Sequence, residues 1–266
     1  KTKMSNEQIN DDDEKILNQI ESIENNVKET QPLISSSKSL DHLLSYYEEN
    51  ELPGFIEGIK FLSTKYPRMR TVRGDGNCFY RSLLFSYLEE IINGLKNPEP
   101  IIQTKTQLEY QNFLDTLRKS KDELVSIGYD EFTFDIFYET LIEFLENLPN
   151  INIQDLCEHF TQQNSADAYT WYMRLLTAGY LKTHHERFYP FINMDDYYYV
   201  DMNAFCQREV EPMGKECEHL QVLALTEYLH VNVTIEYLDG RPRNIGEDIV
   251  KSIQFPSRND DDNNDN

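Results

Sequence analysis

Apolar side chains recur every three or four residues along most of the chain, a spacing that predicts helices with one buried face. The pattern is clearest in residues 79–92, which contain no Pro or Gly. The apolar stripe there consists of Phe79, Leu83, Tyr87 and Ile91. Further helices are predicted over residues 40–49, 55–66, 106–121, 131–148, 166–178 and 220–230.

Local signals refine three of these helices. Thr106 and Glu109 form a capping-box pattern, which predicts that a helix begins there. In residues 131–148 the spacing predicts one core-facing side made of Phe132, Phe137, Leu141, Phe144 and Leu145. Gly179 follows the helix predicted over residues 166–178, in a position where a left-handed residue often ends a helix.

One strand is clear in the sequence. Residues 231–237, VNVTIEY, place Val231, Val233, Ile235 and Tyr237 on alternate positions, as a half-buried strand requires. Asp239-Gly240 then predicts a turn. Helices therefore dominate, with a small sheet.

The two ends differ in composition from the rest. Residues 1–38 are polar and acidic, and we expect a weakly ordered arm, although Ile16, Ile20, Ile23 and Val27 recur at helical spacing. Residues 259–266 are an Asp/Asn-rich tail typical of solvated, low-complexity sequence. One domain is predicted between them, over residues 39–258.

Charge narrows the range of partners. Lys and Arg number 25 and Asp and Glu number 47, giving a net charge of −22. Such a surface repels nucleic acids and acidic membranes and favours basic partners. Four scattered cysteines do not form a disulfide scaffold, and no apolar run reaches the length of a membrane span. We expect a soluble, reduced protein of the cytoplasm or nucleus.

A cysteine lies where a turn-forming loop meets the helix predicted over residues 79–92. Cys78 follows Gly74, Asp75, Gly76 and Asn77, all of which tolerate turn geometry. The unpaired amides and dipole of a helix N-terminus stabilise a thiolate, and loop amides can form an oxyanion hole. A small buried thiol beside an ordinary turn is the alternative that the local pattern leaves open.

Cysteine and histidine pairs elsewhere are a weaker signal of a metal site. Cys157-x-His159 and Cys217-x-His219, together with Cys206, could supply ligands, but the sequence has no CxxC pair. Both segments have the pattern of buried helix. We therefore expect neither a metal nor a cofactor.

Four blocks carry a resemblance to a known family. They are GDGNCFYRSLLFSYLE, YDEFTFDIFYETL, YTWYMRLLTAGYL and FCQREVEPMGKECEHLQVLALTEYL, in this order within residues 40–254. On these blocks the chain resembles the otubain branch of the ovarian-tumour (OTU) cysteine deubiquitinases. The resemblance implies an α/β (α+β) thiol-protease fold with a small sheet flanked by helices. It also implies cleavage of ubiquitin or polyubiquitin from lysine, with ubiquitin-conjugating enzymes as further partners.

The same resemblance gives the loop residues their roles. Cys78 would be the nucleophile, Asp75 the loop residue that the family counts as catalytic, and Gly76 and Asn77 part of the oxyanion loop. The family also has a general-base histidine between strands that follow the region of residues 231–237. Here the sequence instead runs into NDDDNNDN.

Two explanations for the absent histidine stay open. The chain is a fragment without its last strands, or the protein genuinely lacks the base and binds ubiquitin or a conjugating enzyme without cutting. The non-Met start and the intact GDGNCFYR favour the fragment. Under both explanations the sequence as given predicts an inactive enzyme, because the base is absent. If the last strands are missing, the strand at residues 231–237 is also predicted to have an unpaired, aggregation-prone edge.

Overall fold

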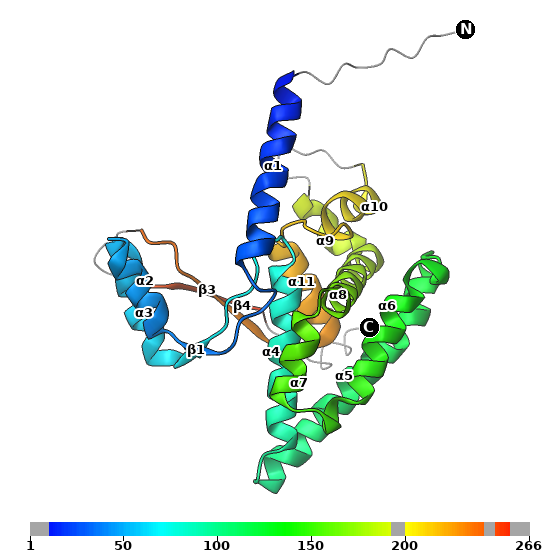
Figure 1. The fold of residues 1–266 in the computed structure, drawn as a ribbon. Helices are drawn as coiled ribbons and strands as arrows, with labels where there is room; N and C mark the ends of the chain where they lie inside the picture. Colours follow the sequence, from blue (N-terminus) through cyan, green and yellow to red (C-terminus); the bar gives the residue numbers. More distant parts are fainter. Residues whose placement is uncertain (1–10, 193–199, 242–247, 256–266) are drawn as a thin grey trace.

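The computed structural model describes residues 11–192, 200–241 and 248–255 (Figure 1). The predicted tail at 259–266 and residues 1–10 of the arm lie outside the described residues. The elements are α1 Asp11–Thr30, β1 Lys38–Ser39, α2 Asp41–Glu49, α3 Pro53–Lys65, β2 Arg68–Met69, α4 Cys78–Leu95, α5 Pro100–Ser126, α6 Glu131–Glu146, η1 Leu148–Asn150, α7 Ile153–Thr161, α8 Gln163–Thr183, α9 His185–Ile192, α10 Met202–Phe205, η2 Cys206–Val210, α11 His219–Leu229, β3 Val233–Tyr237 and β4 Lys251–Phe255.

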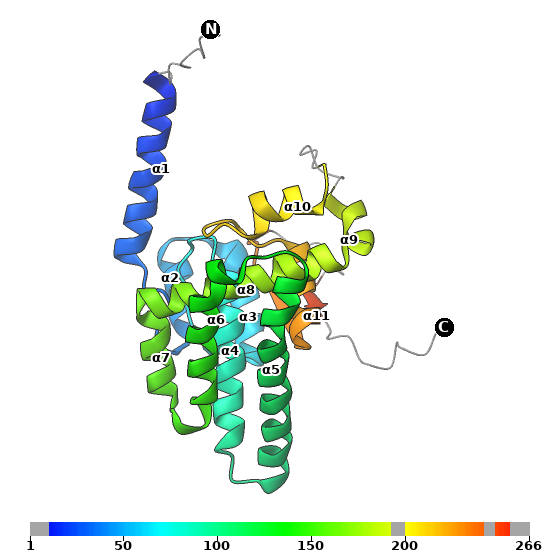
Figure 2. The ribbon, with the colours of Figure 1, turned by 90° about the vertical axis from the view of Figure 1, so that its right-hand side faces the viewer.

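Helix α4 lies inside the main core and packs against α5, α7 and α8 (Figure 2). The predicted helix is confirmed, and Ile91 of the predicted stripe is buried, but other buried side chains lie one position away from that stripe. Tyr80, Leu84 and Leu88 are at most 2% exposed, whereas Phe79 is only partly buried. Neighbours on several sides bury more than one face of α4, so a single amphipathic stripe underestimates its burial.

Three predicted details of the helices are wrong. Helix α5 begins at Pro100 and not at Thr106, because proline is well suited to the first helical turn. Gly179 lies inside α8, where a Cβ would come within 2.8 Å of Leu124 Cδ2; the glycine permits close packing and does not end the helix. Phe132, predicted to face the core, is 92% exposed at the start of α6.

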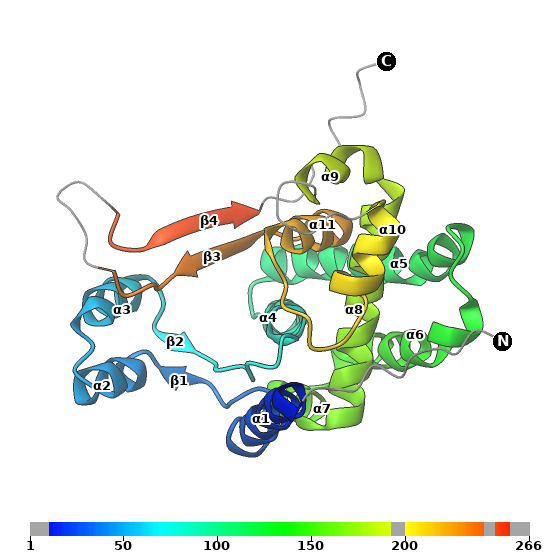
Figure 3. The ribbon, with the colours of Figure 1, turned by 90° about the horizontal axis from the view of Figure 1, so that it is seen from above.

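Two small sheets complete the domain (Figure 3). The predicted strand forms as β3 and pairs antiparallel with β4, with Ile235 opposite Ile253. The expectation of an unpaired β3 edge is therefore wrong on one side of the strand, because Lys251–Phe255 form its partner β4. Strands β1 and β2 form the second sheet, which leads into the loop before α4.

Helix α1 projects from the body of the domain (Figures 1 and 2). Residues 11–30, expected to be weakly ordered, are helical, and Ile16, Ile20 and Ile23 remain 47–57% exposed on it. The apolar stripe is thus formed but not covered by the described part of the chain. None of the described helices combines the length and apolarity needed to cross a membrane.

Candidate active site

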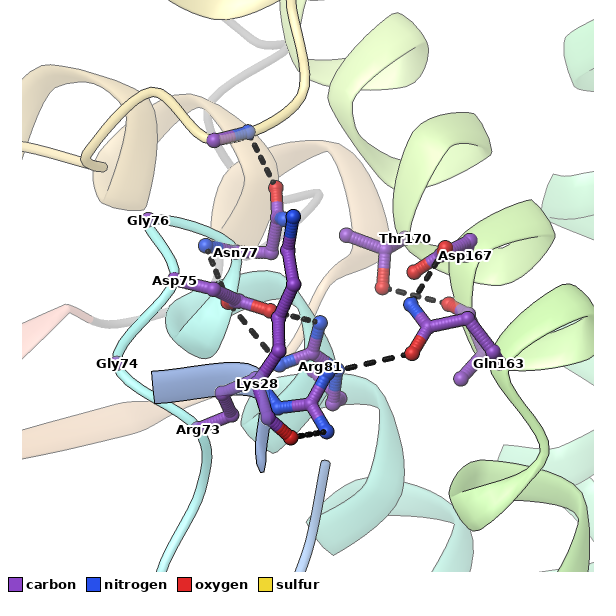
Figure 4. Close-up of polar contacts among 12 residues, drawn as sticks. Lys28, Arg73, Gly74, Asp75, Gly76, Asn77, Arg81, Gln163, Asp167 and Thr170 are labelled. Atoms are coloured by element: carbon purple, nitrogen blue, oxygen red, sulfur yellow. Dashed lines mark hydrogen bonds and ion pairs between the residues drawn. The ribbon is translucent and has the colours of Figure 1, made fainter. Parts of the chain in front are cut away.

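Cys78 is the first residue of α4, and its side chain is exposed. The sequence-based placement at the first turn of a helix is therefore confirmed, and the alternative of a buried structural thiol is not. The preceding loop, residues 73–77, brings three polar side chains and two glycines beneath this end of the helix (Figure 4).

Asp75 fixes the loop to the helix that follows it. Its Oδ1 accepts hydrogen bonds from the backbone N of Asn77 at 3.0 Å and from Arg81 Nη1 at 3.2 Å, and its Oδ2 accepts from Arg81 Nη2 at 2.8 Å. The Arg81 side chain is completely buried, and that of Asp75 is 17% exposed. A two-pronged ion pair of this kind is strong and geometrically specific. No contact between the Asp75 carboxylate and the Cys78 thiol is present.

Asn77 connects the loop to α8 and to the segment before α11. Its Oδ1 accepts from Arg174 Nε at 3.0 Å, from Arg174 Nη2 at 2.8 Å and from the backbone N of Gly214 at 3.0 Å. Asn77 is buried, with 6% of its surface exposed. The side chain therefore acts as a three-way acceptor that holds two distant segments against the loop.

Arg174 was missed by sequence reasoning. Arg174 lies within YTWYMRLLTAGYL, one of the four blocks that carry the family resemblance, but no function was assigned to it from the sequence. The structure places it fully buried, donating also to the carbonyl oxygens of Gly76 (2.8 Å), Val210 (2.9 Å) and Lys215. The available signal was that Arg174 is the only charged residue in the block YTWYMRLLTAGYL, because a guanidinium buried among apolar residues requires a full set of acceptors.

The loop amides are not equally available to a substrate. The N–H of Asn77 is taken by Asp75, and that of Gly74 donates to Gln31 Oε1 at 3.0 Å. In the described part of the chain, the backbone amides of Asp75, Gly76 and Cys78 donate no hydrogen bond to a protein group. These three are therefore the loop donors that remain for an oxyanion.

Gly76 has a backbone requirement that no other residue meets. Its φ is +74°, and a Cβ would lie 2.1 Å from the carbonyl oxygen of Gly214. The left-handed conformation and the close approach of the two backbones both exclude a side chain. The loop and the segment at residue 214 are thus in direct backbone contact.

Beside the loop lies a hollow of about 870 Å³. Ile23 and Val27 of α1 line one part of it, and Phe137 and Trp171 line another. Arg73 joins these parts, donating to the carbonyls of Gln31 (2.8 Å) and Lys28 (3.3 Å) and to Gln163 Oε1 at 3.2 Å (Figure 4). The end of α1 is thereby fixed next to the loop.

No histidine hydrogen-bonds to Cys78, although all six histidines of the sequence lie in the described ranges. The rings of three histidines have other partners: His159 contacts the Tyr169 hydroxyl, His184 the carbonyl of Tyr180, and His219 the Tyr237 hydroxyl.

The other cysteines are poor nucleophiles by comparison. Burial raises the pKa of both the Cys206 and the Cys217 thiol to about 12, so both are neutral at physiological pH. Cys157 is only partly exposed. No group of three or more His, Cys, Asp or Glu side chains suited to a metal occurs among the described residues.

Comparison with known proteins identifies the fold. The sequence profile of the family Peptidase C65 Otubain matches residues 14–266. The chain belongs to the otubain family. The otubain chain is 36% identical to human ubiquitin thioesterase OTUB1 over 228 residues, covering 85% of this chain and 78% of that protein. It is 32% identical to the Arabidopsis thaliana OVARIAN TUMOR DOMAIN-containing deubiquitinating enzyme 1, over 78% of this chain and 65% of that protein.

Solved otubain structures share the architecture. An h/ceOTUB1–ubiquitin aldehyde–UBC13~Ub complex superposes with a TM-score of 0.78 at 26% identity, covering 92% of this chain and 90% of that one. A ceOTUB1–ubiquitin aldehyde–UBC13~Ub complex gives a TM-score of 0.76 at 28% identity, covering 90% of both chains. The predicted family and the predicted OTU-like fold are both confirmed.

Proposed function

We propose that this protein is a thiol-dependent ubiquitin isopeptidase with Cys78 as its nucleophile. The single observation that carries the proposal is the exposed Cys78 thiol at the start of α4, next to a loop whose backbone is fixed by Asp75 and Arg174. The chemistry of such a site, a thiol at a helix N-terminus beside free amides, suits acyl transfer. The names of the relatives supply ubiquitin as the substrate.

The chemical steps follow from the loop geometry. The Cys78 thiolate attacks the carbonyl carbon of the isopeptide bond, and the oxyanion is stabilised by the free amides of Gly76 and Cys78. The C–N bond then breaks, and the lysine amine leaves after taking from solvent the proton that the Cys78 thiol released when it ionised. Water hydrolyses the thioester, which releases the ubiquitin carboxylate and restores the thiol. Asp75 keeps the loop in shape throughout.

The proposal includes a limit on turnover. A cysteine nucleophile needs a base near neutral pH, and no histidine of residues 1–266 is bonded to Cys78. We therefore expect these residues alone to react slowly with substrate, for want of a proton acceptor. The absence of a bonded histidine does not change the geometry of the loop or the position of Cys78.

Imidazole in solution is expected to replace the missing base. The substrate is a fluorogenic amide of the ubiquitin C-terminus, in a buffer of about neutral pH. Added imidazole should raise the turnover rate of the 266-residue chain about tenfold or more. Full turnover without imidazole would contradict the limit but not the isopeptidase. Absence of Cys78-dependent product with and without imidazole would contradict the isopeptidase itself.

A conjugating enzyme is a second candidate partner, favoured by an exposed apolar pair on α6. Phe132 is 92% and Ile136 67% exposed, one turn apart. Lys121 contacts the neighbouring carboxylates of Glu131 and Asp135, at 2.8 and 2.6 Å. An ordered acidic rim around an aromatic anchor is typical of an interaction surface. We propose that this pair contacts the conjugating enzyme and that the apolar stripe of α1 contacts its attached ubiquitin.

Two sets of substitutions separate these surfaces. The double variant Phe132→Ala/Ile136→Ala should bind both the free and the ubiquitin-charged conjugating enzyme about tenfold more weakly. The reason is that exposed anchor side chains contribute about 1–2 kcal/mol to an interface. Ile16→Ser with Ile20→Ser should weaken binding of the charged form alone. Ile101→Ala, 84% exposed on α5, is the matched control. Unchanged affinities in calorimetry for both double variants would remove these surfaces from the proposal.

A further inference from the structure

The guanidinium of Arg174 has no anionic partner. Its hydrogen bonds end on the side-chain oxygen of Asn77 and on backbone carbonyls, all of them neutral. Its Cζ lies 4.5 Å from the ring centroid of Tyr80, a further neutral contact. No carboxylate among the described residues forms an ion pair with it. A buried charge held only by neutral groups is costly and therefore calls for an explanation.

The titratable groups around Arg174 do not cancel its charge. They are Tyr80, Cys217, Asp75 and Cys78. Burial raises the pKa of Tyr80 well above its ordinary value and that of Cys217 to about 12, so both are neutral near pH 7. The Asp75 carboxylate is already paired with Arg81. The charges of Asp75 and Arg81 cancel each other, so the positive charge of Arg174 remains uncompensated near the start of α4.

We propose that Arg174 is a positioning residue whose buried, unpaired charge stabilises negative charge at Cys78 while its planar fork holds the Asp75–Cys78 loop. Two negative species form there: the thiolate before attack and the oxyanion beside the Gly76 and Cys78 amides. Because Arg174 is buried and held in place, its charge acts on both species without reorganising. The role of Arg174 in turnover rests on the proposed isopeptidase function. Its effect on the Cys78 thiolate does not depend on that function.

The identity of residue 77 fits this role. Asparagine offers Arg174 the same oxygen position as aspartate would, but without the negative charge that would neutralise the guanidinium. Aspartate would be the better partner for a buried arginine on stability grounds alone. Asparagine leaves the positive charge available to Cys78.

The test measures the rate at which iodoacetamide alkylates Cys78 at neutral pH, by mass spectrometry of the Cys78 peptide. This reagent reacts with the thiolate and needs no ubiquitin, so failure here is distinct from failure of the isopeptidase. Asn77→Asp should alkylate about tenfold more slowly than the wild type, with an unchanged or higher melting temperature. Asn112→Asp, an exposed change of the same charge on α5, should alkylate at the wild-type rate.

Substitutions of Arg174 separate the charge from the fork. Arg174→Met should alkylate about tenfold more slowly, whereas Arg174→Lys should stay within about threefold of the wild type because it keeps the charge. The Lys variant should nonetheless lose turnover, because it cannot make the forked contacts. If Arg174→Met does not fold, Asn77→Asp decides the outcome alone. Alkylation of Asn77→Asp at the wild-type rate would overturn the proposal.

Discussion

Replacing Cys78 by alanine is expected to abolish product formation from a ubiquitin C-terminal amide, by about 10⁴-fold or more in the presence of imidazole. The sulfur is the only atom lost, and it is exposed, so the change leaves no cavity. The free energy of unfolding should stay within ~0.5 kcal/mol of the wild type. Initial rates and urea denaturation curves, measured on the same preparation, check both statements.

Ubiquitin binding gives the control for this substitution. Cys78→Ala should bind ubiquitin as tightly as the wild type, and Cys157→Ala should keep the wild-type rate. A Cys78→Ala variant that retains a tenth of the activity would show that the nucleophile lies elsewhere.

Replacing Asp75 by alanine is expected to lower the free energy of unfolding by about 3–5 kcal/mol, because it leaves a buried arginine unpaired. Arg81 is completely buried, and its Nε already has no partner among the described residues. The loop would also lose the acceptor of the Asn77 amide. We expect activity to fall about a hundredfold, the usual effect of a misplaced reacting group.

Asp115→Ala is the matched control for the stability effect. Asp115 pairs with Arg118 at 3.5 Å, but both side chains are about half exposed, so the loss should be at most ~1 kcal/mol. Asp75→Asn, which keeps the acceptor for the Asn77 amide but not the charge, should fall between the two. Equal urea midpoints for Asp75→Ala and Asp115→Ala would contradict the role assigned to the Asp75–Arg81 pair.

The local features of the site were predictable from sequence. Two glycines and an Asx residue before a helix without breakers placed Cys78 at the helix N-terminus, and alternation of apolar residues predicted β3. Both depend on residues close together in the chain. The family resemblance then supplied the substrate and the fold.

The features that the sequence did not predict depend on distant contacts. Arg174 reaches Asn77 across 97 positions of the chain. Gly179 is explained only by its approach to Leu124, and the pairing of β3 with β4 only by the return of the chain. Phe132 fits a core pattern by spacing, but the core ends before it reaches the first turn of α6. Periodicity predicts that a face exists, not what covers it.

The most direct test of Cys78 as the nucleophile uses ubiquitin carrying an electrophile at its C-terminus. The wild-type chain is mixed with an equimolar amount, and the adduct is measured by intact mass and then mapped by peptide analysis. We predict one ubiquitin per chain, attached to Cys78 and absent from Cys78→Ala. Attachment to Cys157, Cys206 or Cys217, or no adduct at all, would contradict the central claim.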